Sequence, residues 1–544
     1  AFRHIPDQSA LYIEYLNLSP TALRFYQHAP TWENLKLQCS RRAAHFEHHR
    51  SLIASVLRNQ NESYGCGAAT MRMIDMLEKP DCVAILTGQQ VGLFGGPIYT
   101  FYKAVTATRI AEELRKEGIP AVAVFWMEGE DHDLAEVTRC SFFHPRLGIK
   151  TIDYAKILFD QAAVAARSVG CIRFPESIKQ AVADYLAFVP EAKWKPQVGS
   201  ILETSYHPGA TFTQAFARMM AQIFYPAGLI LYDPQTSQTK QMASSLLKKA
   251  LLDAEMIRNA LLECNRELVS AGFHCQVRIL ENATLLFLTI NGKRCALEKK
   301  PGGFGIKNSH RLLSLAQILK FVEQNPESFS PNVLLRPVIQ DYLFPTVAYV
   351  AGPSELAYFA QARVVYEVFG RDMPVLWPRA SFTLIEPEVA LEMQRLGIEI
   401  QDCFCEREFL MEKAIRNLGS AASLEIIDRL YGQLDSTLSE LGPELRSLDP
   451  TLVQALETAQ RKALHNLHRL KRKIITWETE QHSPLAKVLD LLHCYCFPNR
   501  QLQERCFGLP SFLAVHGPSL LEILRSTTEI SNFSHRLIWL ENQP

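Results

Sequence analysis

The sequence lacks an excess of charge of either sign. Its 544 residues include 57 Lys and Arg and 57 Asp and Glu, so the formal net charge at pH 7 is zero. A neutral chain offers no general attraction for nucleic acids or for anionic membrane surfaces. We therefore expect neither nucleic acid nor a membrane as a partner.

Long apolar runs and ordered cysteine spacings are also missing. No apolar stretch reaches the roughly 20 residues of a membrane-spanning helix, and the first residues, AFRHIPDQSA, lack the apolar core of an export signal. The 13 cysteines follow no repeated spacing, and the pairs Cys403/Cys405 and Cys494/Cys496 do not match the spacing of common zinc sites. We expect reduced, buried thiols, no protein-bound metal and a cytoplasmic location.

Three familiar fingerprints of catalysis or nucleotide binding do not occur. The chain has no G-x-G-x-x-G dinucleotide motif, no Walker A lysine loop and no G-x-S-x-G nucleophile elbow. These absences remove the sequence signals for a dinucleotide enzyme, a P-loop enzyme and an α/β-hydrolase. The chain is also too long for one simple core, so we expect several structural units.

A βαβ unit is the strongest structural pattern that is present. The apolar runs CVAILTG (82–88) and AVAVFWM (121–127) are typical of parallel strands that are buried on both faces. Between them, Pro97 suits the first turn of a helix and Gly118 suits its end. This order predicts an α/β fold with a Rossmann-like parallel-sheet core.

The rest of the chain interrupts and then extends this core. Asn291-Gly292 predicts a β-hairpin turn between two β-rich runs. From about residue 388 the pattern becomes helical, with apolar stripes Ile427, Leu430, Leu434, Leu438, Leu441 and Leu452, Leu456, Ala459, Ala463, Leu467, Leu470, Ile474, Trp477. With Gly442-Pro443 as the break, these stripes predict an antiparallel coiled-coil hairpin; an ordinary helical bundle is the alternative.

These patterns divide the chain into seven segments. We expect N-terminal helices and the first half of the core (1–139), a first insertion (140–205), a core segment (206–238), a second insertion (239–330), the second half of the core (331–387), the coiled coil (388–480) and a C-terminal segment (481–544).

A glycine-rich segment follows the first predicted strand. In LTGQQVGLFGGP, four glycines, Gly88, Gly92, Gly95 and Gly96, stand between the strand and a helix. Glycines let a backbone approach a ligand closely, and a helix N-terminus attracts anions. Gln89 and Gln90 add amide groups that suit a polar ligand, and Tyr99 follows at the start of the helix. We expect a binding site here, rather than only a tight turn.

An acidic tip follows the second predicted strand, in MEGEDHDLAEV. If the two strands are neighbours, the tip faces the glycine-rich segment. Its His132 is a candidate acid or base, and Asp131 or Asp133 could hold an ammonium group, bind a divalent metal or simply cap the next helix. A solvated acidic loop is the alternative without function.

A third polar stretch lies between residues 332 and 355. Arg336 and Asp341 are costly to bury alone, so they pair with each other or contact a ligand. Gly352-Pro353 repeats the layout of Gly96-Pro97, which makes Gly352 and Ser354 part of a second candidate binding turn.

Four blocks together resemble the family of the bacillithiol biosynthesis cysteine-adding enzyme, a cysteine ligase. They are TGQQVGLFGGPIYTFYKAVTA, VFWMEGEDHDLAEV, SPNVLLRPVIQDYLFPTVAYVAGPSELAYFAQ and FPNRQLQER (497–505), in this order along most of the chain. The resemblance implies a Rossmann-like core with two connecting-peptide insertions and a helical coiled coil that forms a homodimer. The family is distantly similar to class I aminoacyl-tRNA synthetases, although this chain lacks their HIGH and KMSKS signatures.

The resemblance also implies a reaction, the last step of bacillithiol synthesis, in which L-cysteine is joined to glucosaminyl-malate through an amide. Amide formation in water calls for activation of the cysteine carboxylate, most simply by ATP. We expect His132 to take a proton from the attacking amine and Asp131 or Asp133 to hold the cysteine ammonium group. The segment from Gly88 to Gly96 would receive phosphate or carboxylate oxygens, with Gln89 and Gln90 orienting polar groups.

Two other functions fit the same residues. One is a nucleotidyl- or glycosyl-transferase on the same core. The other is a non-catalytic protein that binds a thiol metabolite. Both polar strand-end clusters occur together in this chain, which favours an enzyme.

Overall fold

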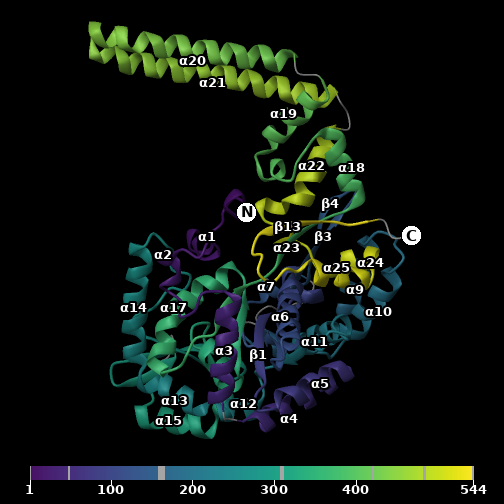
Figure 1. Ribbon diagram of the computed structural model, residues 1–544, viewed down its shortest axis with the longest axis vertical. Coiled ribbons are helices and arrows are strands. Elements are labelled where there is room, and N and C mark those ends of the chain that lie inside the picture. The colour runs from purple at the N-terminus through teal and green to yellow at the C-terminus, as the bar shows by residue number, and fades with distance from the viewer. Residues whose placement is uncertain are drawn as a thin grey trace.

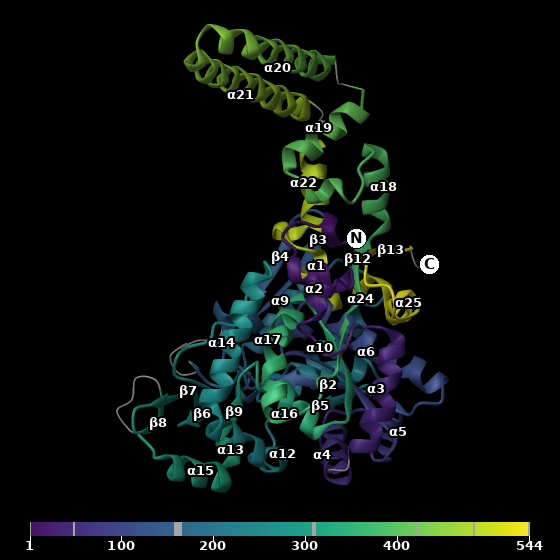
Figure 2. The ribbon, with the colours of Figure 1, turned by 60° about the vertical axis from the view of Figure 1, so that its left-hand side comes forward.

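The computed structural model describes residues 2–46, 49–156, 166–306, 312–419, 422–481 and 485–541. An α/β body carries a long helical hairpin that projects from one end, with a short helical neck between them (Figures 1 and 2). Within the described residues, no helix is both long and apolar enough to cross a lipid bilayer.

A five-stranded parallel sheet forms the centre of the body. Its order is β11-β10-β1-β2-β5. The strands are β1 (Val83–Gln90), β2 (Ala121–Glu128), β5 (Ile230–Tyr232), β10 (Thr346–Ala351) and β11 (Val375–Pro378). β1 and β2 pair from Val83↔Ala121 to Gln90↔Glu128, so the predicted neighbours are confirmed.

The apolar runs of β1 and β2 are explained by burial on both faces of the sheet. Val83 and Ile85 of β1 pack into one hydrophobic core, whereas Ala84 and Leu86 pack into the other. Helix α6 (Tyr99–Lys116) lies on the first side and α17 (Pro353–Phe369) on the second. β1 continues two residues beyond the predicted end at Gly88, because Gln89 and Gln90 still have partners in β2.

The remaining helices of the body surround this sheet. Those before β1 are α1 (Ala10–Leu16), α2 (Pro20–Leu23), α3 (Trp32–His45), α4 (Arg50–Ser63) and α5 (Ala68–Leu77); the later ones are α7 (Leu134–Val137), α11 (Phe212–Ile223) and α16 (Arg336–Leu343). Ser9 and Thr31 cap α1 and α3 by accepting hydrogen bonds from backbone N–H groups of the first turn.

Two insertions interrupt the core. The first contains the antiparallel pair β3 (Arg139–His144) and β4 (Gly148–Asp153), with α9 (Ile178–Phe188) and α10 (Lys195–Ser205). The second contains α12 (Ser237–Met242), α13 (Ser244–Leu252), α14 (Ala254–Ser270), α15 (Leu315–Gln324) and a sheet of order β8-β7-β6-β9 made of β6 (Ala283–Ile290), β7 (Lys293–Lys300), β8 (Gly303–Ile306) and β9 (Phe329–Pro331). The predicted turn at Asn291-Gly292 joins β6 to β7, and both residues have positive φ, at 50° and 75°.

From residue 381 the chain forms the neck and the hairpin and then returns to the body. Its elements are β12 (Ser381–Ile385), α18 (Pro387–Leu396), α19 (Arg407–Asn417), α20 (Ala422–Leu448), α21 (Pro450–Gln481), α22 (Leu485–Cys496), α23 (Gln503–Cys506), α24 (Leu509–His516), α25 (Ser519–Thr527) and β13 (His535–Trp539). β13 pairs in parallel with β12, so the end of the chain is anchored beside the core.

Helices α20 and α21 form the predicted antiparallel hairpin, but its turn is not at Gly442-Pro443. Both residues lie inside α20, where a Cβ atom at Gly442 would lie 3.9 Å from the Leu456 side chain of the opposite helix. The chain reverses at Asp449, whose carboxylate accepts the Thr451 backbone N–H at 2.8 Å while Pro450 opens α21. An aspartate before a proline supplies both a cap and a helix-starting residue, and these signals decide the position of the turn.

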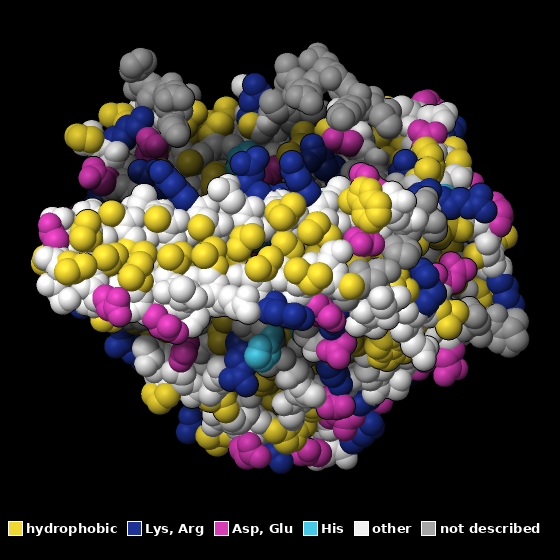
Figure 3. All heavy atoms as spheres, turned by 90° about the horizontal axis from the view of Figure 1, so that it is seen from above, with side chains coloured by type: hydrophobic (Ala, Val, Ile, Leu, Met, Phe, Trp, Pro, Cys, Tyr) yellow, Lys and Arg dark blue, Asp and Glu magenta, His cyan; other side chains and the backbone are white. Residues whose placement is uncertain are grey.

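Part of the stripe predicted for α21 faces solvent. Leu456, Ala463, Leu467 and Ile474 are half-buried, whereas Leu452, Leu470 and Trp477 are about half exposed, at 40%, 47% and 57%. Figure 3, which looks down on the hairpin, shows a row of hydrophobic side chains along its outer surface. The hairpin therefore has an apolar face besides the one that joins its two helices.

Candidate functional site

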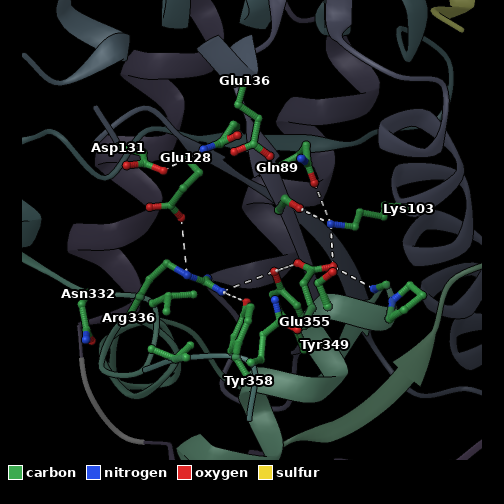
Figure 4. Close-up of a pocket in the computed structure, with 18 of the residues that line it drawn as sticks. Gln89, Lys103, Glu128, Asp131, Glu136, Asn332, Arg336, Tyr349, Glu355 and Tyr358 are labelled. Atoms are coloured by element: carbon green, nitrogen blue, oxygen red, sulfur yellow. Dashed lines mark hydrogen bonds and ion pairs between the residues drawn. The ribbon is translucent and has the colours of Figure 1, made fainter. Parts of the chain in front are cut away.

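A cavity of about 610 Å³ opens at the carboxyl ends of β1, β2 and β10 (Figure 4). The chain leaves β1 through α6, toward β2 on one side, and leaves β10 through α17, toward β11 on the other side. Between β1 and β10 the direction of the connections thus reverses. Ligands of open α/β sheets bind at this kind of switch point.

The structure brings most of the candidate site residues to this cavity. The candidates that line it are Gly88, Gln89, Gln90, Tyr99, Asp131, His132, Arg336, Gly352 and Ser354. The ends of two neighbouring strands and the N-terminus of α17 therefore meet around one space.

Gly92, Gly95 and Gly96 are not among the residues that line the cavity. Gly95 has φ of +88°, and a Cβ atom there would lie 2.6 Å from the Phe101 ring. A Cβ atom at Gly92 would lie 2.9 Å from the Cα of Gly96. These three glycines form a buried turn into α6, where backbone conformation and close packing explain them.

Asp133 is a helix cap. Its carboxylate accepts the backbone N–H groups of Ala135 and Glu136 at the start of α7, at 3.1 and 3.4 Å, and it does not line the cavity. Asp131 instead faces the strand end, where Gln90 donates to its Oδ2 at 2.7 Å. Of the two aspartates, the geometry favours Asp131 as a ligand-binding group.

Lys103 organises the end of β1. Its ammonium group donates to the Gly88 carbonyl and to Gln89 Oε1, both at 2.8 Å, and forms an ion pair with Glu355 at 2.6 Å. Burial lowers the pKa of Lys103, and the Glu355 carboxylate opposes that shift. Because an ammonium group has three N–H donors, these contacts use all of them. Lys103 therefore holds Gln89 in place and has no donor left for a ligand.

Arg336 is held in a similar way. It donates to the Tyr358 hydroxyl at 2.7 Å, and its Nε lies 3.4 Å from Glu128 (Figure 4). It also donates to Gln340 Oε1 at 2.9 Å. The predicted direct pairing of Arg336 with Asp341 is wrong. Gln340 stands between them and donates to Asp341 at 3.0 Å, because Arg336 points toward the cavity and Asp341 toward the core of the body.

Glu128, the last residue of β2, has the most perturbed carboxyl group of the cavity. Burial raises the pKa of Glu128 to about 7, although the neighbouring Arg336 guanidinium acts in the opposite direction. A carboxyl group that titrates near neutral pH can gain or lose a proton during a reaction. Glu128 therefore joins His132 as a group suited to proton transfer or to charge pairing.

His132 lies between Asp131 and an arginine of the second insertion. Its Nδ1 is 3.4 Å from Asp131 Oδ1 and 3.4 Å from Arg294 Nη1. The side chain of His132 is 42% exposed, whereas that of Arg294 is 7% exposed and stacks on the Phe287 ring at 3.7 Å. An arginine can donate hydrogen bonds but cannot accept them, so Asp131 is the acceptor for an Nδ1–H group of His132. In the tautomer that carries its proton on Nδ1, the Nε2 lone pair of a neutral His132 is free.

Comparison with known proteins finds family models that match almost the whole chain. Residues 3–380 match the model of the bacillithiol biosynthesis BshC N-terminal Rossmann-like domain, and residues 382–540 match that of the BshC C-terminal coiled-coil domain. The chain belongs to the BshC family.

Curated members of this family are similar along most of their length. The chain is 34% identical to the "Putative cysteine ligase BshC" of Chlorobaculum tepidum over 509 residues, which are 90% of this chain and 89% of the relative. It is 32% identical to the proteins of the same name from Salinibacter ruber, over 90% of this chain and 88% of the relative, and Koribacter versatilis, over 96% and 95%. The expected family and its fold are thus confirmed.

Several cavity residues of this BshC-family chain were not identified from the sequence. Arg294 comes from β7, Arg379 follows β11 and Arg505 belongs to α23. Arg294 and Arg379 stand in segments with no recognisable motif, whereas Arg505 closes the FPNRQLQER block. Only the tertiary fold brings the three arginines to the strand ends. Lys103 had a local signal, because it stands four residues after Tyr99 on the same helix and so shares its face.

The basic and acidic groups are mixed around the cavity. Five basic residues (Lys103, Arg294, Arg336, Arg379, Arg505) and four acidic residues (Glu128, Asp131, Glu136, Glu355) line it. Among the described residues, no group of three or more His, Cys, Asp and Glu is arranged to hold a metal ion. The arrangement suits a zwitterionic ligand such as an amino acid, which needs both signs of charge.

Proposed function

We propose that this BshC-family chain is an ATP-consuming ligase that joins L-cysteine to the amine of glucosaminyl-malate through an amide bond. The observation that carries the proposal is the meeting of the β1 end, the His132 tip and the α17 N-terminus around one cavity of mixed charge. A cavity of about 610 Å³ can enclose cysteine together with a reacting amine.

The chemistry requires activation of a carboxylate. A carboxylate oxygen is a poor leaving group, so one carboxylate oxygen of cysteine first forms a bond to a phosphorus atom of ATP. The bond that breaks releases either ADP or pyrophosphate. The glucosamine amine then attacks the acyl carbon, the carbon–oxygen bond to the phosphorus group breaks, and the amine loses a proton. Positioning and fixed dipoles supply most of the rate gain in such a reaction.

The proposed roles fall to groups that line the first cavity. Asp131 and Glu128 hold the cysteine ammonium group, and His132 accepts the amine proton at Nε2 while Asp131 fixes its tautomer. Gln89 and Gln90 orient polar substrate groups, and Gly88 allows close approach at the strand end. The Gly352 N–H donates to Glu355 Oε2 at 2.7 Å, so the Ser354 backbone N–H, at the start of the 17-residue helix α17, is the group that receives a negatively charged oxygen.

The coiled coil gives the proposal a second partner, another copy of the chain. The apolar row on the outer surface of the hairpin supports a homodimer that forms there (Figure 3). We also place the reaction in the cytoplasm. All 13 cysteines are unpaired in the structure, as thiols are in a reducing compartment.

One experiment tests the ligase proposal. Purified protein is mixed with L-cysteine and glucosaminyl-malate, with and without ATP, and the products are identified by mass spectrometry. The proposal expects the amide product only when ATP is present. Substrate binding without any product would favour a metabolite-binding protein, and transfer of a nucleotidyl or sugar group without cysteine would favour a transferase.

A further inference from the structure

A second cavity, of about 470 Å³, adjoins the first. The two share four lining residues, Gln276, Pro353, Ser354 and Arg505. The second cavity is otherwise lined by the N-terminal segment Pro6 to Ser9, by His274 and by Phe497 and Asn499 to Leu502. Most of the FPNRQLQER block, which has no role in the first cavity except through Arg505, therefore lines this space.

The backbone of this block is strained where it meets the second cavity. Asn499 and Arg500 follow each other with φ of 52° and 60°, in the left-handed region that residues other than glycine seldom adopt. The turn is held by backbone hydrogen bonds from Arg500 N to Phe497 O at 3.2 Å and from Gln501 N to Pro498 O at 3.0 Å. Strain of this kind is concentrated at ligand-binding segments.

The second cavity carries positive charge that the fold does not neutralise. Among the residues that line it, two arginines, Arg500 and Arg505, stand against one acidic residue, Asp7. Arg500 contacts Glu406 at 3.2 Å, but both side chains are at least two-thirds exposed, so the pair is weak. Within the described part of the chain, no carboxylate lies within ion-pair distance of Arg505, whose nearest aromatic partner is Tyr99 at 6.0 Å.

The neighbour of Arg505 explains why its charge stays available. Glu504 is fully buried and accepts hydrogen bonds from Arg379 at 2.6 Å, from the Ser381 hydroxyl and from the Phe382 backbone. Burial alone would raise the pKa of Glu504, but Arg379 holds it below its ordinary value. The Glu504 charge is therefore neutralised by Arg379 and not by Arg505. The same buried contacts hold α23 in place, so that Arg505 lies at the junction of the two cavities.

We propose that the second cavity is the subsite for the dicarboxylate end of the acceptor, with Arg500 and Arg505 binding its carboxylates. This inference rests on the proposed ligase function. In a glucosaminyl compound the malyl group is attached to C1 and the amine to the adjacent C2. A molecule that spans the shared rim thus places its amine in the first cavity while its carboxylates stay in the second.

Two substitutions test the subsite. Arg500→Asn keeps a residue type that tolerates left-handed backbone, and Arg505→Gln removes the charge at the junction. Arg469→Gln, on the exposed surface of α21, is the control with the same change of charge. In the ligation reaction we expect each variant to raise KM for glucosaminyl-malate about tenfold or more, because each loses charged hydrogen bonds to the acceptor carboxylates. KM for cysteine should stay within about twofold.

A further test uses an acceptor that lacks the malyl group. With methyl glucosaminide, which lacks both carboxylates, the wild-type and variant proteins should have equal KM values. An unchanged KM for glucosaminyl-malate in Arg500→Asn would overturn the subsite while the ligase function stands.

A binding measurement separates this proposal from the ligase proposal. In calorimetric titrations with L-malate and with pyrophosphate, neither of which needs turnover, we expect malate binding to be lost in Arg500→Asn and kept in Arg469→Gln. If the variant loses pyrophosphate binding and keeps malate binding, the cavity takes nucleotide phosphates and the assignment to the acceptor is overturned. If no amide product ever forms but malate binding depends on Arg500, the subsite stands and the ligase function fails.

Discussion

At the scale of single residues, the cavity separates groups that hold the site together from groups that are free to meet a ligand. Lys103 and Arg336 give their donors to neighbouring protein groups. Among the residues that the structure describes, the polar contacts of the His132 and Glu128 side chains are all long, at 3.4 Å, so we take their lone pairs as available. The sequence pointed to His132 because it stands among acidic residues after a strand, but it gave no means of telling which cations are occupied.

The role of His132 as a proton acceptor predicts a loss of turnover. We expect His132→Ala to lower kcat about 100-fold or more while the dissociation constant of cysteine changes little, because general base catalysis contributes on that scale. Steady-state kinetics and calorimetric binding measure the two quantities, with His465→Ala on α21 as the control. A fall in kcat of less than about threefold, below 1 kcal/mol of barrier, would contradict the role.

Glu128 predicts a pH dependence of cysteine binding. Its carboxyl group has a pKa of about 7, so it is largely neutral below that pH and negatively charged above it. We expect KM for cysteine to fall as the pH rises through about 7, and Glu128→Gln to remove this dependence.

The same shift affects stability, with a sign that follows from proton binding. An unfolded glutamate releases its proton near 4.5, whereas folded Glu128 keeps it to about 7. The free energy of unfolding should therefore decrease as the pH rises from about 4.5 to 7, and it should decrease less in Glu128→Gln. Denaturant titrations of both proteins across this range check the difference; equal slopes would contradict the shifted pKa.

At the scale of elements, the sequence predicts what local patterns determine. The apolar runs of β1 and β2, and the turn at Asn291-Gly292, follow from period and turn chemistry and are found where expected. The hairpin turn was misplaced because Gly442-Pro443 is a strong local break, which packing of α20 against α21 overrides. The contributions of Arg294 and Arg505 depend on contacts between distant segments, which no local pattern encodes.

The glycine-rich turn before α6 predicts a stability defect without a binding defect. Gly95→Ala forces a side chain into a left-handed backbone and against Phe101, so we expect a loss of about 2–4 kcal/mol in the free energy of unfolding. Gly370, at φ of 62° with open space around it, is the matched control, and Gly370→Ala should cost about 1 kcal/mol. Urea denaturation measures both. If Gly95→Ala were as mild as Gly370→Ala, the packing explanation would fail.

At the scale of the whole molecule, the body contains both cavities and the hairpin stands apart from it (Figures 1 and 2). Helices α18, α19 and α22 form the neck between the two, and the FPNRQLQER block follows directly after α22. The N-terminal segment and this block both line the second cavity, so segments that lie far apart in the sequence meet there.

The exposed apolar row of the hairpin predicts a dimer that acidic substitutions disrupt. Leu430 and Leu470 are 46% and 47% exposed, and we expect the double variant Leu430→Glu/Leu470→Glu to be a monomer where the wild type has twice the monomer mass. Sedimentation equilibrium measures the mass, and Leu252→Glu, an exposed leucine on α13, is the control. A wild-type monomer, or a double variant that still dimerises, would contradict the proposed interface.

The central claim, that cysteine is activated through its carboxylate in the first cavity, is tested most directly with an isotope. Cysteine labelled with oxygen-18 in the carboxylate is converted in the presence of glucosaminyl-malate and ATP, and the phosphorus-containing products are analysed by mass spectrometry. The account predicts that a labelled oxygen from cysteine appears in AMP or inorganic phosphate for each amide formed, and that His132→Ala forms both products more slowly. If the amide forms while AMP and inorganic phosphate carry no label from cysteine, the account is contradicted.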